Sequence, residues 1–188
     1  MQVEQTALPG VVILTPRRFG DGRGHFSETW NRSRFAGHGI ACDFVQDNQS
    51  LSVARGTVRG LHCQAPPHAQ AKLVRVVAGA VLDVAVDVRR GSPDYGRWVA
   101  VPLSAADGRQ LFIPEGFLHG FVTLEPMTEV LYKCSAHYAP ECERAVRFDD
   151  PAIGVDWGID PAAAILSEKD AAAGSLGELD SPFAFAPP

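Results

Sequence analysis

The sequence lacks the features of a membrane, nucleic-acid-binding or disulfide-stabilised protein. No apolar run approaches the ~20 residues that span a bilayer, and no charged-then-apolar leader follows Met1. The net charge is -5, so no basic field attracts nucleic acid or an anionic membrane surface. Four cysteines without a C-x-x-C pair do not form a disulfide framework in a chain of 188 residues. We therefore expect a single cytoplasmic domain over 1–188 with reduced thiols.

Helical periodicity is scarce, whereas short stretches of strand-like alternation are frequent. Turn residues separate these stretches, as in the DGRG run at 21–24. Many short strands at close spacing predict an all-β sandwich or closed barrel, with a few short helices near 31–36 and 161–172. Residues 173–188 are rich in Ala, Gly and Pro, which predicts a loose C-terminal tail. The predicted strands cover 11–18, 25–30, 43–52, 57–64, 71–78, 80–88, 97–103, 109–113, 119–124, 128–138 and 143–148.

Alternation along two of these strands assigns side chains to faces. Over 128–138, Tyr132 shares a face with apolar residues, so its side chain is expected to point inward. A buried hydroxyl without a hydrogen-bond partner costs roughly 1–3 kcal/mol, so we expect Tyr132 to have one. Over 80–88, Asp83 and Asp87 share a face. Paired carboxylates on a strand are usually edge or solvent features, and we assign them no catalytic role.

Two stretches resemble the two motifs of the cupin barrel. The run GRQLFIPEGFLHGFVT over 108–123 has the Gly, Pro, Gly and His spacing of the second motif and contains His119. The run from 56 to 79 resembles the first motif and contains His62. The resemblance implies a jelly-roll barrel of antiparallel strands.

The usual metal ligands of a cupin are partly replaced. Gln64 and Lys72 occupy the positions where metal-binding cupins have a second His and a Glu. An amide is a poor transition-metal ligand, and an ammonium has no lone pair to donate. A cation at the carboxylate position would also repel a metal ion. We therefore expect no metal and no other cofactor.

A fixed positive charge in this position suits proton removal from a carbon beside a ketone. Negative charge then develops on the carbonyl oxygen, and Lys72, with Arg59 if it faces inward, can stabilise it. His62 is the candidate base because an imidazole titrates near neutral pH. Arg59 and His62 would point to opposite faces of a regular strand, so the glycine at position 60 predicts a local bulge.

Longer runs resemble the dTDP-4-dehydrorhamnose 3,5-epimerase family. These are QDNQS at 46–50, RGLHCQAPPHAQAK at 59–72, IPEGFLHGF at 113–121 and DDPAIGVDW at 149–157. The resemblance covers residues 3–170, with departures at Cys63 and Phe148. It implies epimerisation at C3 and C5 of dTDP-4-keto-6-deoxy-D-glucose to dTDP-4-keto-L-rhamnose, by a homodimer.

The family also implies roles for individual residues. His62 would be the proton acceptor with Asp170 as its orienting carboxylate, and Tyr132 the proton donor on the opposite face of the sugar. Lys72, with Arg59, would stabilise the enolate oxygen. The residues implied to bind substrate are Arg23, Glu28, Gln46, Asp47, Asn48, Arg59, His119, Tyr138, Glu143 and Lys169.

The segment 21–30 is implied to reach across a dimer interface, with Arg23 at the diphosphate. Several alternatives remain open: a mono-epimerase acting at C3 or C5 only, a ketoisomerase, a metal-dependent cupin, and a non-catalytic sugar-binding protein. Retention of Tyr132 favours double inversion. Gln64 and Lys72 disfavour a metal enzyme, and the presence of both His62 and Tyr132 disfavours a non-catalytic protein.

Overall fold

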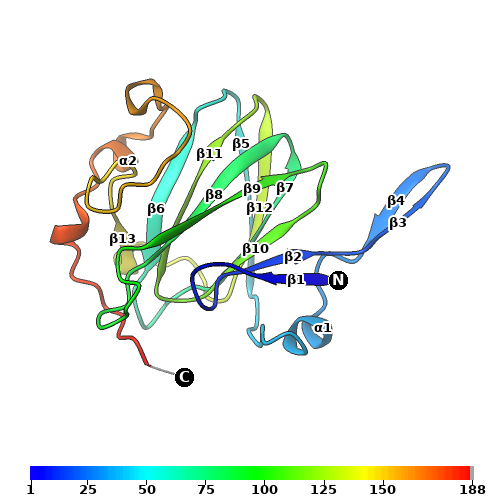
Figure 1. Cartoon of the computed structure of the whole chain (residues 1–188), viewed down its shortest axis with the longest axis horizontal. Helices are drawn as coiled ribbons and strands as arrows, with labels where there is room; N and C mark the ends of the chain where they lie inside the picture. Colours follow the sequence, from blue (N-terminus) through cyan, green and yellow to red (C-terminus); the bar gives the residue numbers. More distant parts are fainter. Residues whose placement is uncertain (187–188) are drawn as a thin grey trace.

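The computed structural model describes residues 1–186, which form two antiparallel sheets that face each other and a two-stranded arm at one side (Figure 1). The sheets have the strand orders β1-β2-β10-β7-β12-β5 and β13-β6-β11-β8-β9. This is the predicted all-β jelly roll. The strands are β1 Gln2–Gln5, β2 Val12–Thr15, β3 Arg18–Asp21, β4 Gly24–Ser27, β5 Gln46–Ser52, β6 Val58–Gln64, β7 Lys72–Ala78, β8 Ala80–Asp87, β9 Trp98–Ser104, β10 Gln110–Ile113, β11 Phe117–Thr123, β12 Thr128–Cys134 and β13 Glu143–Ala145.

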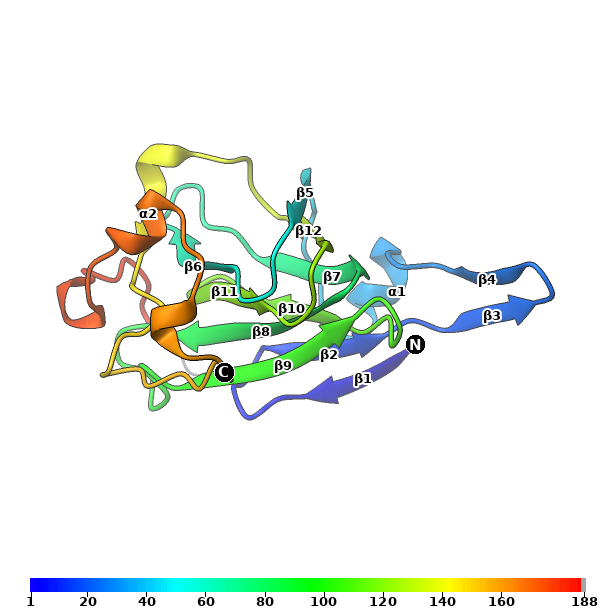
Figure 2. The same ribbon diagram turned by 90° about the horizontal axis from the view of Figure 1, so that it is seen from above.

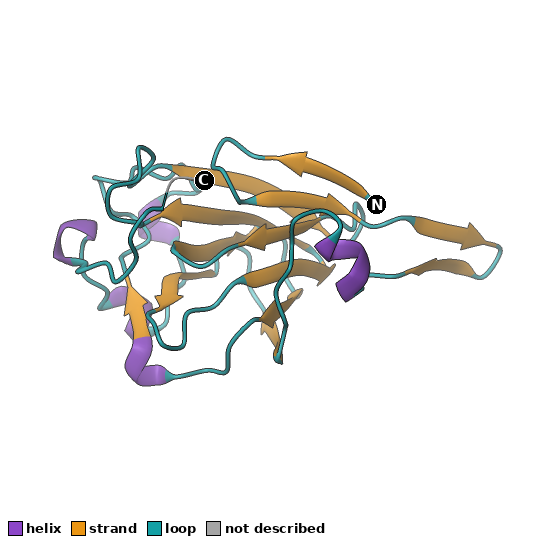
Figure 3. Cartoon of the chain, turned by 90° about the horizontal axis from the view of Figure 1, so that it is seen from below, coloured by secondary structure: helices purple, strands orange, loops and turns teal. Residues whose placement is uncertain are grey.

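Helices are short and lie at the margins of the sheets (Figure 3). The predicted helix near 31–36 is confirmed as α1, Arg32–Ala36. The second prediction, over 161–172, is only partly right. Ile165 forms a bridge with Thr57, just before β6, and this bridge separates a 3-10 turn from α2, Glu168–Ala171. The 3-10 turns are Pro140–Cys142, Pro161–Ala163 and Leu176–Glu178. Among residues 1–186, no helix has the length and apolar character needed to cross a membrane.

The inward faces of the two sheets enclose the main hydrophobic core. Val74 and Val130 contribute from one sheet, and Val81, Ala85 and Phe121 from the other. The alternation that brings these residues inward also turns Tyr132 inward, where it packs against the core as predicted. The predicted strand 128–138 ends earlier, at Cys134.

A second core covers the outer face of the five-stranded sheet. Trp157, Leu176 and Phe183 pack against this face together with residues of β8 and β11. The prediction of a loose tail is therefore wrong for 173–186: Phe183 is 9% exposed, and its carbonyl accepts a hydrogen bond from the backbone of Arg90. The last two residues of the predicted tail, 187–188, lie outside the described residues.

Strand β8 is covered on both faces, because the tail packs on one side and the six-stranded sheet on the other. It also has β9 and β11 as neighbours in its own sheet. Asp83 and Asp87 are consequently 0% exposed, and the expectation that they lie at an edge or in solvent is wrong. Asp87 bonds to Arg89 and Ser92, whereas Asp83 bonds to His119.

The arm of β3 and β4 extends away from the body of the molecule (Figures 1 and 2). It contains most of the segment 21–30. Two aromatic side chains on the arm are largely uncovered, Phe19 at 50% and Phe26 at 70% exposure. Large apolar side chains exposed on a projecting hairpin are typical of a surface that meets a partner.

The bulge predicted at Gly60 is confirmed. Across the β6–β11 pair, His62 lies opposite His119 but Arg59 lies opposite Phe121, so β6 has one extra residue between these points. The two strands approach closely here, because a Cβ on Gly60 would lie 2.5 Å from the Cα of Gly120. The extra residue brings Arg59 and His62 to the same, inward face.

Candidate active site

A cleft of about 110 Å³ opens between the two sheets. It is lined by polar side chains that replace the apolar core at this end of the molecule. The sequence analysis identified seven of the lining residues as substrate-binding or catalytic: Gln46, Asn48, His62, Lys72, Tyr132, Tyr138 and Glu143. The remaining lining residues are Cys63, Gln64 and Gln70.

His62 and Asp170 form a close pair at the wall of the cleft. His62 Nε2 lies 2.5 Å from Asp170 Oδ1, and the His62 side chain is 26% exposed. Asp170 comes from α2, which begins after Ser167. Burial alone would raise the pKa of Asp170, but hydrogen bonds from His62 and Ser167 lower it, so the carboxylate stays charged. Because Nε2 is engaged by an acceptor, Nδ1 is the ring nitrogen left to take a proton.

The sequence analysis missed Ser167. Its hydroxyl donates to Asp170 Oδ2 at 2.8 Å and accepts a hydrogen bond from the Asp170 backbone N–H at 3.1 Å. The signal was present as the pattern S-x-x-D at a helix start, where serine is a favoured N-cap. Ser167 thus fixes both the start of α2 and the rotamer of the carboxylate.

A second His–Asp pair lies directly beside the first. His119 Nε2 is 2.7 Å from Asp83 Oδ1, and the His119 side chain is only 7% exposed. Burial lowers the pKa of His119, and the Asp83 carboxylate only partly opposes this, so the imidazole is neutral at pH 7. The sequence analysis identified His119 but missed Asp83.

Tyr132 and Lys72 reach the cleft from the opposite sheet. Tyr132 on β12 pairs with Asn48 on β5, and Lys72 lies at the start of β7. Burial raises the pKa of Tyr132 above its usual value of 10.0, so the hydroxyl is protonated at neutral pH. Burial also lowers the pKa of Lys72. His62 and Tyr132 therefore enter the same cleft from two different sheets.

Three residues form a hydrogen-bonded rim at the mouth of the cleft. Tyr138 Oη donates to Glu143 at 2.9 Å, and Lys169 forms an ion pair with the same carboxylate. Burial alone would raise the pKa of Glu143, but the bonds from Lys169 and Tyr138 lower it. Tyr138 is 56% exposed, which leaves its ring available to a ligand.

The other predicted residues lie outside the cleft. Asp47 is on the outward face of β5, where it pairs with Lys133 at 2.8 Å. Arg23 and Glu28 lie on or next to the arm, paired with Asp21 and Arg34 respectively. Arg59 faces inward but donates to Ser52 Oγ and the Leu51 carbonyl, each at 3.2 Å.

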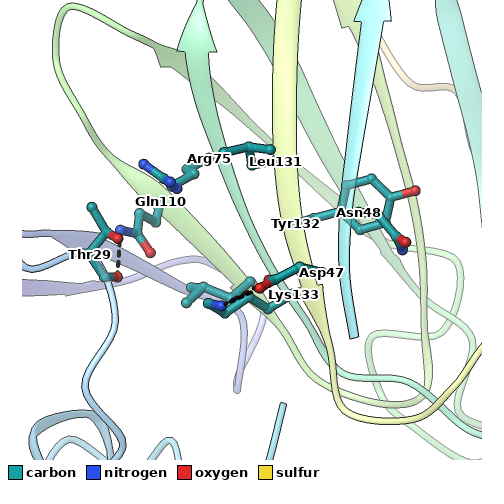
Figure 4. Close-up of a pocket in the computed structure, with 9 residues that line it drawn as sticks. Thr29, Asp47, Asn48, Arg75, Gln110, Leu131, Tyr132 and Lys133 are labelled. Carbon is teal, nitrogen blue, oxygen red and sulfur yellow. Dashed lines mark hydrogen bonds and ion pairs between the residues drawn. The ribbon is translucent and has the colours of Figure 1, made fainter. Parts of the chain in front are cut away.

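Asp47 belongs instead to a different cavity, of about 200 Å³, which is mainly on the outer side of the six-stranded sheet. Figure 4 shows Arg75, Gln110 and Leu131 on one side of β12 and the Tyr132 and Asn48 side chains on the other. The two cavities share only the residues Asn48 and Tyr132. The cleft with His62 is therefore the candidate active site.

The Gln64 side chain connects two loops by hydrogen bonds, a structural role that the sequence analysis did not predict. Its side-chain amide donates to the His68 carbonyl at 2.7 Å and accepts from the Ala139 N–H at 2.9 Å, which joins the loops on either side of the cleft. In the described part of the chain, no group of three or more His, Cys, Asp or Glu side chains has the arrangement of a metal site.

Comparison with known proteins identifies this jelly roll as one of the nucleotide-sugar epimerases. The family model described as dTDP-4-dehydrorhamnose 3,5-epimerase matches residues 5–178. The chain belongs to this family of isomerases, as the sequence resemblance indicated.

Individual relatives extend over nearly the whole chain. A dTDP-4-dehydrorhamnose 3,5-epimerase of Sinorhizobium fredii is 48% identical over 185 residues, which covers 98% of this chain and 94% of that protein. The dTDP-6-deoxy-D-glucose-3,5-epimerase of Legionella pneumophila, solved with dTDP-4-keto-L-rhamnose, is 43% identical with a TM-score of 0.93, covering 98% and 99% of the two chains. A 3'-monoepimerase of Streptomyces bikiniensis, solved with dTDP-quinovose, is 35% identical with a TM-score of 0.84, covering 92% and 86%.

Proposed function

We propose that the protein inverts C3 and C5 of dTDP-4-keto-6-deoxy-D-glucose to give dTDP-4-keto-L-rhamnose, the precursor of dTDP-L-rhamnose. The observation that carries this proposal is the opposition of two proton-transfer groups across one cleft. His62, with Asp170, comes from one sheet and Tyr132 from the facing sheet. Inversion requires that a proton leave one face of a carbon and return to the other, so it needs two such groups.

His62 is the base. Its Nδ1 takes the proton from the carbon beside the C4 ketone, and the bonding electrons move to the carbonyl oxygen to form an enolate. Asp170 holds Nε2 at 2.5 Å, which fixes the tautomer and stabilises the imidazolium once it forms. A well-placed general base contributes about 10²–10⁴ in rate.

Tyr132 is the acid on the opposite face. Its raised pKa keeps the hydroxyl protonated until the enolate carbon takes the proton. The resulting phenolate lies near the Arg59 guanidinium, whose charge acts to lower the pKa of Tyr132. Arg59 thus stabilises the transient anion without removing the proton beforehand.

Lys72 stabilises the enolate oxygen. Its ammonium lies on the inward face of β7, in a cleft where a charge interacts more strongly than in water. This role uses only protein groups, and accordingly we propose that the enzyme needs no metal or cofactor.

The remaining cleft residues bind the substrate. Gln46, Asn48, His119, Tyr138, Glu143 and Lys169 lie in the cleft or border it. Arg23, Glu28 and the aromatic residues of the arm reach the cleft of a second copy, so the working form is a homodimer. We further propose that the protein is cytoplasmic, where nucleotide sugars are made. Sedimentation should give twice the chain mass of 20.2 kDa; a monomer at micromolar concentration would contradict the arm's role.

A mono-epimerase acting at one carbon is the second candidate, because the family's fold also supports a 3'-monoepimerase. The higher identity to the 3,5-epimerases favours double inversion. A ketoisomerase needs no pair of proton-transfer groups on opposite faces, and a metal-dependent cupin needs ligands that Gln64 and Lys72 do not provide.

Deuterium incorporation separates these candidates. The protein is incubated with dTDP-4-keto-6-deoxyglucose in D2O, and the sugar is analysed by NMR. Label at both C3 and C5 is expected. Label at one carbon would show a mono-epimerase, and no label in folded protein would overturn the epimerase proposal.

A further inference from the structure

Asp83 carries a buried oxygen that the mechanism above leaves unexplained. It lies on the inward face of β8 between Val81 and Ala85 and is 0% exposed. Its Oδ1 is 2.7 Å from His119 Nε2, but its Oδ2 has no hydrogen-bond partner among the described residues. A buried polar atom left unpaired costs about 1–3 kcal/mol, and more when it is charged, so its retention needs a reason.

The facing sheet supplies a matching charge. Lys72 follows the alternation of Val74 and Val76 on β7, so its side chain shares the inward face that Asp83 meets from β8. No ion pair within 4.0 Å joins Lys72 to any residue of the described chain. The titratable groups that act on it from the surrounding strands are Cys134 on β12, Cys63 on β6, Asp83 on β8, Glu143 on β13 and His119 on β11.

Only two of these groups are carboxylates. Glu143 is already engaged by Lys169 and Tyr138 at the rim. Asp83 has no cation of its own, because its one partner, His119, is a neutral imidazole. Asp83 is therefore the carboxylate whose charge remains to balance the Lys72 ammonium.

We propose that Asp83 is a positioning residue that keeps Lys72 in its ammonium form, so that the enolate oxygen meets a fixed positive charge. This inference rests on the proposed role of Lys72. Lys72 is partly buried, and burial by itself lowers the pKa of its ammonium group, so a nearby carboxylate is needed to favour the charged form. His119 stays neutral beside the lysine because burial lowers its pKa by more than the bond to Asp83 raises it.

The proposal can be tested on Lys72 directly, because the chain has only three lysines, Lys72, Lys133 and Lys169. Protein labelled with 13C at lysine Cε is titrated by NMR, and Lys72→Met assigns the signals. In Asp83→Asn, which keeps an acceptor for His119, the pKa of Lys72 should fall by about 1–3 units. Lys133 and Lys169 serve as internal references and should not move.

Asp87→Asn is the matched control. Asp87 lies on the same strand and face and is equally buried, but its carboxylate bonds to Arg89 and Ser92. The Asp87→Asn variant should leave the pKa of Lys72 unchanged. An unchanged Lys72 titration in Asp83→Asn, or an equal shift in Asp87→Asn, would overturn the proposal whether or not the protein is an epimerase.

Activity gives a second readout. Removal of the carboxylate lowers the pKa of Lys72, so the alkaline limb of the pH profile for deuterium exchange should move to lower pH in Asp83→Asn. The acid limb should stay in place. An equal loss at every pH would show a merely structural role. If wild-type protein exchanges no deuterium, the proposed function fails, but the NMR titration still decides the pairing.

A stability measurement covers the case in which Asp83→Asn does not fold. The double variant Asp83→Asn/Lys72→Met removes both charges at once. If the two groups balance each other, it should be more stable than Lys72→Met alone, which leaves Asp83 uncompensated. A double variant less stable than Lys72→Met would contradict the pairing.

Discussion

The two His–Asp pairs of the cleft are neighbours with nearly equal geometry but very different access to solvent. His62 and His119 lie opposite each other on β6 and β11, with contacts of 2.5 and 2.7 Å to their carboxylates. The His62 side chain is 26% exposed, whereas that of His119 is 7% exposed. Asp170 comes from a short helix at the edge of the fold, whereas Asp83 comes from the doubly covered strand β8.

The difference in solvent exposure indicates that a His–Asp pair is not by itself a catalytic base. A base must exchange its proton with substrate and solvent, which the exposure of His62 permits. His119 is enclosed, so its pair with Asp83 works as a fixed hydrogen bond. The contrast between a pair that we propose moves a proton and a pair that we propose does not leads to the following predictions.

The largest effect is expected for His62→Ala. Loss of the base should lower deuterium incorporation by about 10²–10⁴-fold, because no other cleft residue replaces Nδ1. Binding of dTDP, measured by calorimetry, should persist. His68→Ala is the control, since that side chain is exposed and makes no hydrogen bond. Retained exchange in His62→Ala would show that another group is the base.

Tyr132→Phe should separate proton removal from inversion. The base is intact, so deuterium should still enter the sugar, but delivery of a proton to the opposite face should fall by about 10²-fold or more. NMR of the product distinguishes exchange with retention from exchange with inversion. Inversion at the wild-type rate would exclude Tyr132 as the acid.

Asp170→Asn should reduce activity less than His62→Ala, by about 10²-fold, because the imidazole remains but loses its orienting charge. The variant should also be less stable at pH 7 by about 1.5–3 kcal/mol, the range for a hydrogen bond to a charged group.

The stability effect of Asp170→Asn should depend on pH. The folded-state pKa of Asp170 lies below its ordinary value of 3.8, so the carboxylate stabilises the fold above that pH and the contribution is lost as pH falls through the folded-state pKa. Urea unfolding should show that the difference in free energy of unfolding between wild type and variant is smaller at about pH 3 than at pH 7. A difference in free energy of unfolding that grows on acidification would contradict the lowered pKa of Asp170.

The smallest effect is expected for Ser167→Ala. The substitution removes the N-cap of α2 and the bond to Asp170 Oδ2, at a cost of about 0.5–2 kcal/mol in stability. Activity should fall by about tenfold or less, because the His62 contact remains. Ser175→Ala, at a 3-10 turn remote from the cleft, is the control and should leave kcat unchanged. A loss as large as that of Asp170→Asn would mean that Ser167 contributes more than orientation.

Much of the cleft was predictable because two sequence patterns, strand alternation and the cupin motif spacing, both point to its residues. Strand alternation turned Tyr132 inward, and the motif spacing identified His62 and Lys72. The irregularity at Gly60 followed from one residue, because an interior glycine that relieves a close strand approach is visible in sequence.

What the sequence could not predict depends on contacts between distant segments. Asp83 looks like an edge residue until the six-stranded sheet is seen to cover its face of β8 and β9 and β11 to flank the strand. The tail is not loose because it packs against the outer face of the five-stranded sheet. Asp47 matches a family motif, but alternation along β5 turns it outward, away from Gln46 and Asn48. Arg23 and Glu28 lie on or next to the projecting arm, outside the cleft of their own chain.

The most direct test compares deuterium exchange in His62→Ala and His119→Asn across a range of pH. If His62 moves the proton and His119 does not, exchange should fall by about 10²–10⁴-fold at every pH in the first variant and much less in the second. Exchange that survives in His62→Ala but disappears in His119→Asn would contradict the assignment of the two pairs.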